Sequence, residues 1–386
     1  MQQPEGFNDR SSCVLRLHKA LYGLKQAGRA WHQCLRGTLL SFGYIQSTAD
    51  KCIYIRINGS NIEIICVYVD DLGLFANTKE GMAQVKGELN GKFPMTDLGE
   101  MKKILGNRVE RDRDKGTLKI SQGPYIDIIL AQFNMQNSNS ISTLLSKTVK
   151  LTVPIQSTNG PTIDAPYAKA IGSIMYSALG SRPDLAFAVQ HLSQFTTSYG
   201  PEHWTAVKHV LRYLKGTRDD GLTFSQETGL DLELFVDANY ANWANDLSIG
   251  GYVAMLGSRS IAWSSKKQRT VTLSMTKAEY IALTEGTKQL VWLRRFLTDL
   301  GFDKSQPTSI HLDNLGVTTL SHDTTYHART KHINVTYHFI CERAASNKVA
   351  LTYVRLKENP ADLMTKALDL SQHQYLCSKL GFSEML

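Results

Sequence analysis

Two short apolar runs near the N-terminus carry the clearest hydrophobic pattern in the chain. They are KCIYIRI, residues 51–57, and IEIICVYV, residues 62–69, and the polar residues NGSN separate them. Apolar, β-branched runs on either side of an Asn-Gly pair predict a β-hairpin. Asp70 and Asp71 follow the second run, at the far end of this hairpin. Because unpaired buried charges are costly, we expect these carboxylates to face water, a cation or a metal ion.

Apolar residues recur at helical spacing in several longer segments. Residues 17–44 predict a helix, although Gly23 and Gly28 lower the helix propensity near its start. Residues 136–166 are rich in Ser, Thr, Asn and Pro and predict a long connection. Helical patterns return in three segments, residues 167–181, 182–198 and 201–217.

From residue 231 the pattern changes to that of strands. Three short apolar runs predict strands, over residues 231–241, 249–258 and 259–265. The rest predicts, in order, a helix at 275–301, a strand at 308–314, a helix at 315–321, a strand at 348–356 and a helix at 359–368. The order β-β-β-α-β-α-β-α predicts an α/β (α+β) fold with helices packed on a mixed sheet.

Composition narrows the class of protein without identifying it. The 386 residues suffice for two or three domains, and 42% hydrophobic with 20% charged residues is ordinary for a globular chain. No apolar run approaches the roughly 20 residues of a membrane span. The N-terminus also lacks the pattern of a signal peptide, so we expect a cytoplasmic or nuclear protein with no membrane partner. The six cysteines form no C-x-x-C pair, and the net charge of +8 is compatible with a polyanionic partner.

Four acidic residues lie at the ends of predicted elements in the last third of the chain. Asp237 ends the first strand, Glu279 opens the long helix, Asp313 ends the fourth strand, and Asp362 opens the final helix. Each alone has a structural explanation. The Thr276–Glu279 segment matches a capping box, Asp313 could cap a helix, and an acid in the first turn, such as Asp362, suits the helix dipole.

Together the four acids favour a metal-dependent enzyme. Converging carboxylates repel one another and raise their pKa values, and Mg²⁺, which prefers oxygen ligands, relieves that repulsion. Two such ions ~3.5–4 Å apart can hold the attacking and leaving oxygens of a phosphoryl displacement. The pattern D…E…D…D on this predicted scaffold therefore indicates a nuclease.

Longer motifs in the same order resemble a known family. The C-terminal part is similar to the ribonuclease H domain of copia-class long-terminal-repeat retrotransposon polyproteins, through the segments FVDANYANW, MTKAEYIAL, IHLDN, HARTKHINVTYHFICE and NPADLMTKAL. The upstream part resembles the reverse transcriptase of the same polyproteins, through MQQPEGF, RLHKALYGLKQAGRAWHQCL, YVDD, FPMTDLGE and HWTAVKHVLRYLKGT. The resemblance covers nearly the whole chain.

The resemblance implies a domain order and two metal sites. It implies a partial reverse transcriptase (palm and start of the thumb) at 1–135, a linker and helical thumb or connection region at 136–230, and a ribonuclease H-like domain at 231–386. The metal-binding acids of that domain match Asp237, Glu279, Asp313 and Asp362, and the palm aspartates match Asp70 and Asp71. The implied cofactor is Mg²⁺ or Mn²⁺, with two ions at the ribonuclease H site. The implied partner is an RNA–DNA hybrid or template–primer, and the oligomeric state is left open.

Departures from the family pattern modify these expectations. A further metal-binding aspartate of the family's polymerase lies before the MQQPEGF stretch, as does the fingers region. We therefore expect this chain not to polymerise DNA by itself, which a primer-extension assay would test. Asn239 replaces the usual second aspartate of Asp-Ala-Asp, a change expected to affect solvation more than chemistry, and Gly28 replaces a usual proline.

Several basic and aromatic residues are candidates for nucleic-acid binding. In the family, the segment holding Lys25, Arg29 and Trp31 lies close to the template–primer. Lysine and arginine at helical or strand-end positions could contact phosphates or form a solvated face, namely Lys208, Arg212, Lys215, Lys266 and Lys267.

Four histidines could bind zinc, assist proton transfer or lie on a polar surface, namely His322, His327, His332 and His338. Two alternatives to an enzyme also remain. The chain could be a catalytically silent nucleic-acid-binding remnant, or a protein recruited by the host for its fold.

Overall fold

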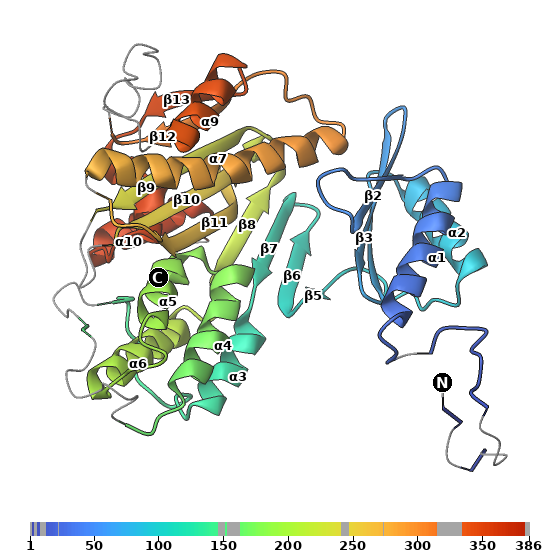
Figure 1. The fold of residues 1–386 in the computed structure, drawn as a ribbon, viewed down its shortest axis with the longest axis horizontal. Coiled ribbons are helices and arrows are strands. Elements are labelled where there is room, and N and C mark those ends of the chain that lie inside the picture. Colours follow the sequence, from blue (N-terminus) through green and yellow to red (C-terminus); the bar gives the residue numbers. More distant parts are fainter. Residues whose placement is uncertain are drawn as a thin grey trace. The chain divides into compact units, whose positions relative to one another are not determined.

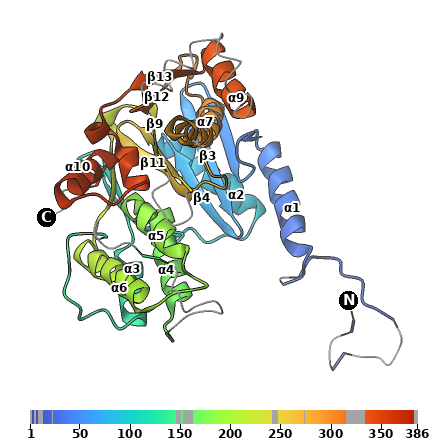
Figure 2. The same cartoon turned by 60° about the vertical axis from the view of Figure 1, so that its left-hand side comes forward.

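The computed structural model describes residues 2–3, 6–7, 13–21, 23–145, 151–152, 163–240, 247–272, 274–314 and 334–382. It divides into two compact units, one of residues 1–99 and 293–302 and one of residues 100–292 and 303–386. Figures 1 and 2 show their elements from two directions. None of the described helices combines the length and apolar character that a membrane crossing requires.

In the first unit, two helices cover a four-stranded antiparallel sheet. The strands lie in the order β1-β2-β3-β4. Their bounds are β1 Ile45–Gln46, β2 Ile53–Asn58, β3 Asn61–Tyr68 and β4 Asp71–Ala76, and the helices are α1 Ala27–Ser41 and α2 Lys79–Lys92. Leu35 and Leu39 of α1 share one core with Val85 and Leu89 of α2 and with Ile65 of β3. Burial of these side chains fixes both helices to the sheet.

The predicted hairpin is confirmed, while the predicted first helix is too long at its start. Strands β2 and β3 pair from Asn58↔Asn61 onward, and Gly59 takes a φ of +61° in the turn. The helix predicted over 17–44 is formed only from Ala27 to Ser41. Gly23 has a φ of +87°, which an α-helix cannot contain, so the helix starts after it.

The second unit contains two sheets. Strands β5 Lys103–Ile104, β6 Asn107–Asp112, β7 Thr117–Ser121 and β8 Gly221–Ser225 form an antiparallel sheet. The other sheet has the order β11-β10-β9-β12-β13, with bounds β9 Leu232–Asn239, β10 Ile249–Leu256, β11 Arg259–Lys267, β12 Thr308–Leu312 and β13 Val349–Tyr353. Strand β12 runs parallel to β9 and β13, whereas β9, β10 and β11 are antiparallel. The predicted mixed sheet is therefore confirmed.

Helices cover both faces of the mixed sheet. The helices of this unit are α3 Gly123–Gln132, α4 Tyr167–Gly180, η1 Pro183–Leu185, α5 Ala186–Ser193, α6 Pro201–Gly216, η2 Gln226–Thr228, α7 Met275–Asp299, α9 Asn334–Ala345, η3 Leu356–Glu358, η4 Pro360–Met364 and α10 Leu370–Leu380. The last residues of α7, from 293 onward, are grouped with the first unit. Helix α7 packs against one face of the sheet (Figure 1), and glycines in β10 and α7 allow this close contact. On the other face, Val253 and Met255 of β10 share a core with Leu376 and Leu380 of α10.

The final helix differs from the prediction, which placed it at residues 359–368. Residues Pro360–Met364 form the 3₁₀ helix η4 instead, and α10 begins only at Leu370. Two caps cause this break: the Asn359 side chain accepts the Ala361 N–H at the start of η4, and Asp369 accepts the Gln372 N–H at the start of α10. The helix predicted at 315–321 lies outside the described residues.

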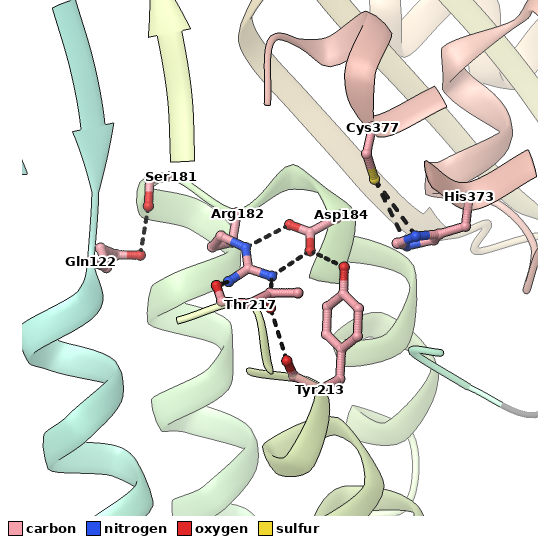
Figure 3. A network of polar contacts seen from close by, with 8 residues as sticks. All are labelled: Gln122, Ser181, Arg182, Asp184, Tyr213, Thr217, His373 and Cys377. Carbon is pink, nitrogen blue, oxygen red and sulfur yellow. Dashed lines mark hydrogen bonds and ion pairs between the residues drawn. The ribbon is translucent and has the colours of Figure 1, made fainter. Parts of the chain in front are cut away.

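A buried ion pair organises the helices before the mixed sheet (Figure 3). Arg182 and Asp184 are both 0% exposed, and the Arg182 Nη2 lies 2.7 Å from the Asp184 Oδ2. Arg182 also donates to the carbonyl and hydroxyl of Thr217 at 2.8 and 2.7 Å, and the Tyr213 hydroxyl donates to Asp184 at 2.9 Å. Burial acts to raise the pKa of Asp184, but the charge of Arg182 and the hydrogen bonds from Arg182 and Tyr213 together lower that pKa. Both charges are therefore paired within the protein.

This network lies where the helical region meets the last elements of the chain. His373 and Cys377 of α10 lie beside the network of Arg182 and Asp184 (Figure 3). In the same region, η1 and α5 pack against η4. The Trp263 Nε1 of β11 donates to the carbonyl of Ala178 at 2.7 Å. Therefore η1 and α5 support η4, and α4 and α6 in turn pack against α5. The three-part division into 1–135, 136–230 and 231–386 stays a prediction.

Removing one member of the buried pair should destabilise the second unit strongly. Arg182→Met leaves Asp184 charged and buried, so we expect the free energy of unfolding to fall by about 3–5 kcal/mol. The double variant Arg182→Met, Asp184→Asn removes the stranded charge and should recover part of this loss. Urea denaturation measures both.

A matched exposed pair serves as the control. Arg113 and Glu100 lie 2.8 Å apart with side chains 65% and 54% exposed, so Arg113→Met should change the same free energy by less than about 1 kcal/mol. Equal losses for the two arginine variants would contradict the role given to the buried pair.

Candidate active site

Three of the four predicted acids come together at one edge of the mixed sheet. Asp237 lies near the end of β9, and Asp313 directly follows β12, which runs parallel to β9. Glu279 lies near the start of α7. One carboxylate oxygen from each lies within 4.8 Å of those of the other two, and Asp237 and Glu279 are only 2% and 5% exposed. The topology thus concentrates negative charge at one buried point.

Close packing of α7 on the sheet positions Glu279. A Cβ at Gly286 of α7 would lie 3.1 Å from Leu234 and 3.2 Å from Val236, both on β9. A Cβ at Gly250 of β10 would lie 3.1 Å from the Cβ of Ala282. Small residues at these contacts let the helix approach the strands closely, which places its first turns beside the end of β9.

The structure contradicts the capping-box explanation for Glu279. Helix α7 already begins at Met275, and the Ser274 hydroxyl accepts the Lys277 N–H at 3.2 Å. Ser274 therefore takes the capping position that the sequence pattern suggested for Thr276. Glu279 lies one turn after the start of the helix, and its carboxylate lies close to those of Asp237 and Asp313.

The fourth acid, Asp362, is held by η4. The Asn359 amide, besides capping η4, donates to the carbonyl of Val236 in β9 at 2.9 Å. The Thr365 hydroxyl donates to Asp237 Oδ2, and the Asn239 amide donates to the Thr365 carbonyl at 3.1 Å. An aspartate at 239 could not make this last bond, so the departure from Asp-Ala-Asp has a structural use.

Close approach of η4 to the sheet depends on one glycine. Gly251 of β10 pairs with Asp237, and a Cβ there would lie 2.4 Å from the Cβ of Met364 and 2.9 Å from the Thr365 side chain. Heavy atoms do not approach so closely without a shift of the backbone. Gly251 therefore allows η4, with Asp362, to lie over the end of β9.

Burial and mutual repulsion shift the pKa values of this cluster. Burial, followed by the charges of Asp237 and Asp313, raises the pKa of Glu279 to about 9. Burial and Asp237 raise the pKa of Asp362 to about 7, and the same causes raise the pKa of Asp313. Groups that disfavour their charged forms so strongly favour an added cation.

The donor set fits a hard divalent cation. All four acids offer carboxylate oxygens, the ligand type that Mg²⁺ and Mn²⁺ prefer. Among the described residues, the only group of three or more potential ligands whose atoms lie this close together is Asp237, Glu279 and Asp313. One lysine, Lys366, lies beside Asp362 and Asp237, at 2.9 and 3.5 Å.

Asp70 and Asp71 occupy a different kind of place, in the first unit. They are exposed, in a tight turn where Tyr68 of β3 pairs with Asp71 of β4. Val69 has a φ of +54°, which is strained for a β-branched residue. The Trp31 Nε1 donates to the Val69 carbonyl at 3.0 Å, and its ring packs on Phe93. Trp31, predicted to bind nucleic acid, therefore supports this turn from within the unit.

The predicted basic contacts divide into internal and exposed groups. Arg212 and Lys215 of α6 donate to the carbonyls of Asn139 and Ser138, at 2.7 and 2.6 Å, so they hold the connection that follows α3. Lys267 donates to Gln194 at 2.8 Å. Of the remaining candidates, Lys208 is half-buried, and three are exposed, namely Lys25, Arg29 and Lys266.

Some residues of the site were missed by sequence analysis, and some predictions cannot be placed. The missed residues lie around Asp362, namely Asn359, Thr365 and Lys366. They belong to the same short motif as Asp362, NPADLMTK, and this proximity in the sequence could have identified them. His338 is exposed on α9. The other three histidines lie outside the described residues, namely His322, His327 and His332.

Comparisons with known proteins place the chain in a family. Residues 1–147 match the family described as reverse transcriptase (RNA-dependent DNA polymerase). The chain is 39% identical, over 98% of its length, to the retrovirus-related Pol polyprotein from transposon TNT 1-94 of Nicotiana tabacum. It is 36% identical, over 100% of its length, to that from transposon RE1 of Arabidopsis thaliana. The chain spans 29% and 26% of these two proteins.

A shorter relative is matched over most of its own length. The putative transposon Ty5-1 protein of Saccharomyces cerevisiae is 31% identical over 75% of this chain and 94% of that protein. Among solved structures, a foamy viral protease-reverse transcriptase in complex with double-stranded DNA overlaps 75% of this chain and 46% of that one, with a TM-score of 0.44 and 11% identity. The sequence matches carry the assignment: the chain belongs to the Pol polyproteins of copia-type retrotransposons, and its first 147 residues match their reverse transcriptase.

Proposed function

We propose that the mixed-sheet part of the second unit is a ribonuclease H, which hydrolyses the RNA strand of RNA–DNA hybrids with two divalent metal ions. The observation that carries this proposal is the meeting of Asp237, Glu279 and Asp313 within 4.8 Å at one buried sheet edge. Asp362, held over the same strand end by η4, is the fourth acid of the site. Hydrolysis of a phosphodiester by the two-metal mechanism requires such a concentration of oxygen ligands beside the substrate.

The four acids would hold Mg²⁺ or Mn²⁺. Two such ions, when bound, activate water and neutralise charge on the transferred phosphate. The protein's own part is to keep the ligands ready. Thr365 donates to Asp237 and fixes its carboxylate, while the Asn359 bond to β9 keeps Asp362 near it. Glu279, with its pKa of about 9, holds a proton at neutral pH that it must release when it becomes a ligand.

A basic residue near this edge suits the proposed substrate. Lys266 is exposed near the end of β11 and pairs with Gly250 of β10. The next residue of β10, Gly251, pairs with Asp237 of β9. Lys266 therefore lies at the same end of the sheet as Asp237. Two strand spacings separate β9 from β11, roughly 10 Å, a reach that a neighbouring phosphate of a bound duplex can span. We assign Lys266 a sequence-independent phosphate contact, which salt should weaken.

For the first unit we propose that Asp70 and Asp71 serve the reverse transcriptase of the polyprotein as metal-binding acids. The observation in favour is their exposed place in a strained turn that Trp31 supports. Residues held in strained backbone conformations, as Val69 is, cluster at active sites. No hydrolysis of hybrid is expected from this pair.

Loss of one central carboxylate should abolish hybrid cleavage without unfolding the protein. Asp237→Asn keeps the shape of the side chain but removes a metal ligand, and we expect the rate of hybrid cleavage to fall by about 100-fold or more. A labelled RNA–DNA hybrid, incubated with the purified chain in Mg²⁺, measures this rate.

The matched control lies on the same strand. Glu233 of β9 bonds to His311 at 2.9 Å and is not part of the acidic cluster, so Glu233→Gln should cleave at the parental rate. Cleavage that survives Asp237→Asn would sink the proposal. A parent that binds hybrid in a salt-dependent way but never cleaves it would instead favour the catalytically silent remnant.

The raised pKa of Glu279 also predicts how stability depends on pH. Because its folded pKa of about 9 lies above the ordinary value of 4.5, the folded protein keeps a proton that the unfolded chain has lost. The stabilisation from this proton is fully present below the unfolded pKa and is lost as the pH rises through the folded one. In EDTA, the parental free energy of unfolding should therefore decline between about pH 5 and pH 9.

Glu279→Gln tests this origin of the decline. Glutamine does not titrate, so the variant should lose less stability than the parent over the same range. Urea denaturation at several pH values measures both proteins. A decline of the same size in the two would show that Glu279 is not its source.

A further inference from the structure

Among the described residues, Lys366 is a cation that lies beside the acidic cluster. Lys366 follows η4 and lies four residues after Asp362, so the turn of the chain returns its side chain toward that acid. Its Nζ lies 2.9 Å from Asp362 Oδ1 and 3.5 Å from Asp237 Oδ2. The Lys366 side chain is 30% exposed, whereas those of the two carboxylates are 6% and 3% exposed. The ammonium therefore lies at the border between the buried acids and solvent.

The charge of Lys366 acts on the whole cluster. Its positive charge opposes the rise in pKa of Glu279, Asp313 and Asp362. Burial lowers the pKa of Lys366 itself, but Asp237 and Asp362 outweigh that effect and raise it. A lysine so placed stabilises the acids in their charged forms, which a bound divalent cation would also do.

We infer that Lys366 is the counter-ion of the site in its metal-free state, and that a divalent cation must displace its ammonium from Asp237 and Asp362 in order to bind. The inference rests on the proposed function, because it concerns the same four acids. It assigns Lys366 as a positioning residue: it keeps the carboxylates together when no metal is bound and lowers the affinity for metal by competing for their oxygens.

The structure also shows where the displaced side chain can go. A pocket of about 330 Å³, open to solvent, adjoins Asp362 between η3, η4 and the start of α10, and Lys366 is part of its lining. Lysine carries its charge on a flexible four-carbon stem, so rotation about its side-chain bonds can move the ammonium into this space. The lining also includes polar side chains, namely Asp369, Ser371 and Gln372. The displaced ammonium of Lys366 would therefore lie beside polar groups.

Two lysines of one pocket allow a matched experiment. Lys366→Met and Lys366→Gln remove the counter-ion, Lys366→Arg keeps a cation, and Lys357→Met changes an exposed lysine of the same pocket. Two measurements on the full chain, without nucleic acid, suffice. They are the midpoint of thermal unfolding in EDTA and in Mg²⁺, and the affinity for Mn²⁺ by calorimetric titration.

The expected results follow from competition. Without Lys366 the acids lose their counter-ion, so Lys366→Met and Lys366→Gln should unfold several degrees lower than the parent in EDTA, and Mg²⁺ should close most of this gap. With the competitor removed, both should bind Mn²⁺ about tenfold more tightly. Lys366→Arg should stay nearer the parent, and Lys357→Met should match it in both measurements.

Clear outcomes oppose the inference. Unchanged or weaker Mn²⁺ binding by both Lys366→Met and Lys366→Gln would overturn it, as would a loss of stability that is equal in EDTA and in Mg²⁺. A lysine that serves only to contact substrate would leave metal affinity in the absence of nucleic acid unchanged. Because neither readout involves cleavage, a chain that shows the predicted Mn²⁺ competition but cleaves no hybrid would refute the ribonuclease proposal and leave this one standing.

Discussion

Repulsion among carboxylates at the end of β9 is the constraint on which the second unit depends. Three acids within 4.8 Å, two of them nearly inaccessible to water, oppose folding unless protons, a lysine or metal ions compensate their charge. Several groups around the cluster reduce or balance its negative charge. Glu279 keeps a proton, Lys366 pairs with Asp362, and Thr365 donates to Asp237. The surrounding close contacts, at Gly250, Gly251 and Gly286, bring the acids together in spite of this cost.

The helices before the mixed sheet contribute to the same end. The buried pair of Arg182 and Asp184 fixes α6 to η1, and η1 with α5 packs against η4, the segment that carries Asp362. A region whose sequence suggested a connection or thumb is therefore also a foundation for the proposed nuclease site. This arrangement links the fold of one part of the polyprotein to the chemistry proposed for the next.

Sequence analysis predicted the order of the main elements and the acids, because both are written in local patterns. Asp237 lies near the end of one clear strand and Asp313 directly follows another, and the Asn-Gly turn between β2 and β3 forms as expected. It failed where tertiary contacts decide. The 3₁₀ helix η4 depends on the bond from Asn359 to β9, which no periodicity shows. The internal bond of Arg212 to Asn139 likewise cannot be distinguished by spacing from a phosphate contact.

The close contact at Gly251 bears on how copies of such an element lose function. Any side chain there would force η4 away from β10, since even a methyl group would lie 2.4 Å from Met364. Asp362 would move with η4, yet all four acids would remain in the sequence. For the proposed nuclease, a survey that scores only the four acidic residues would count a copy with a substitution at this glycine as intact, although its η4 could not pack on β10 as it does here.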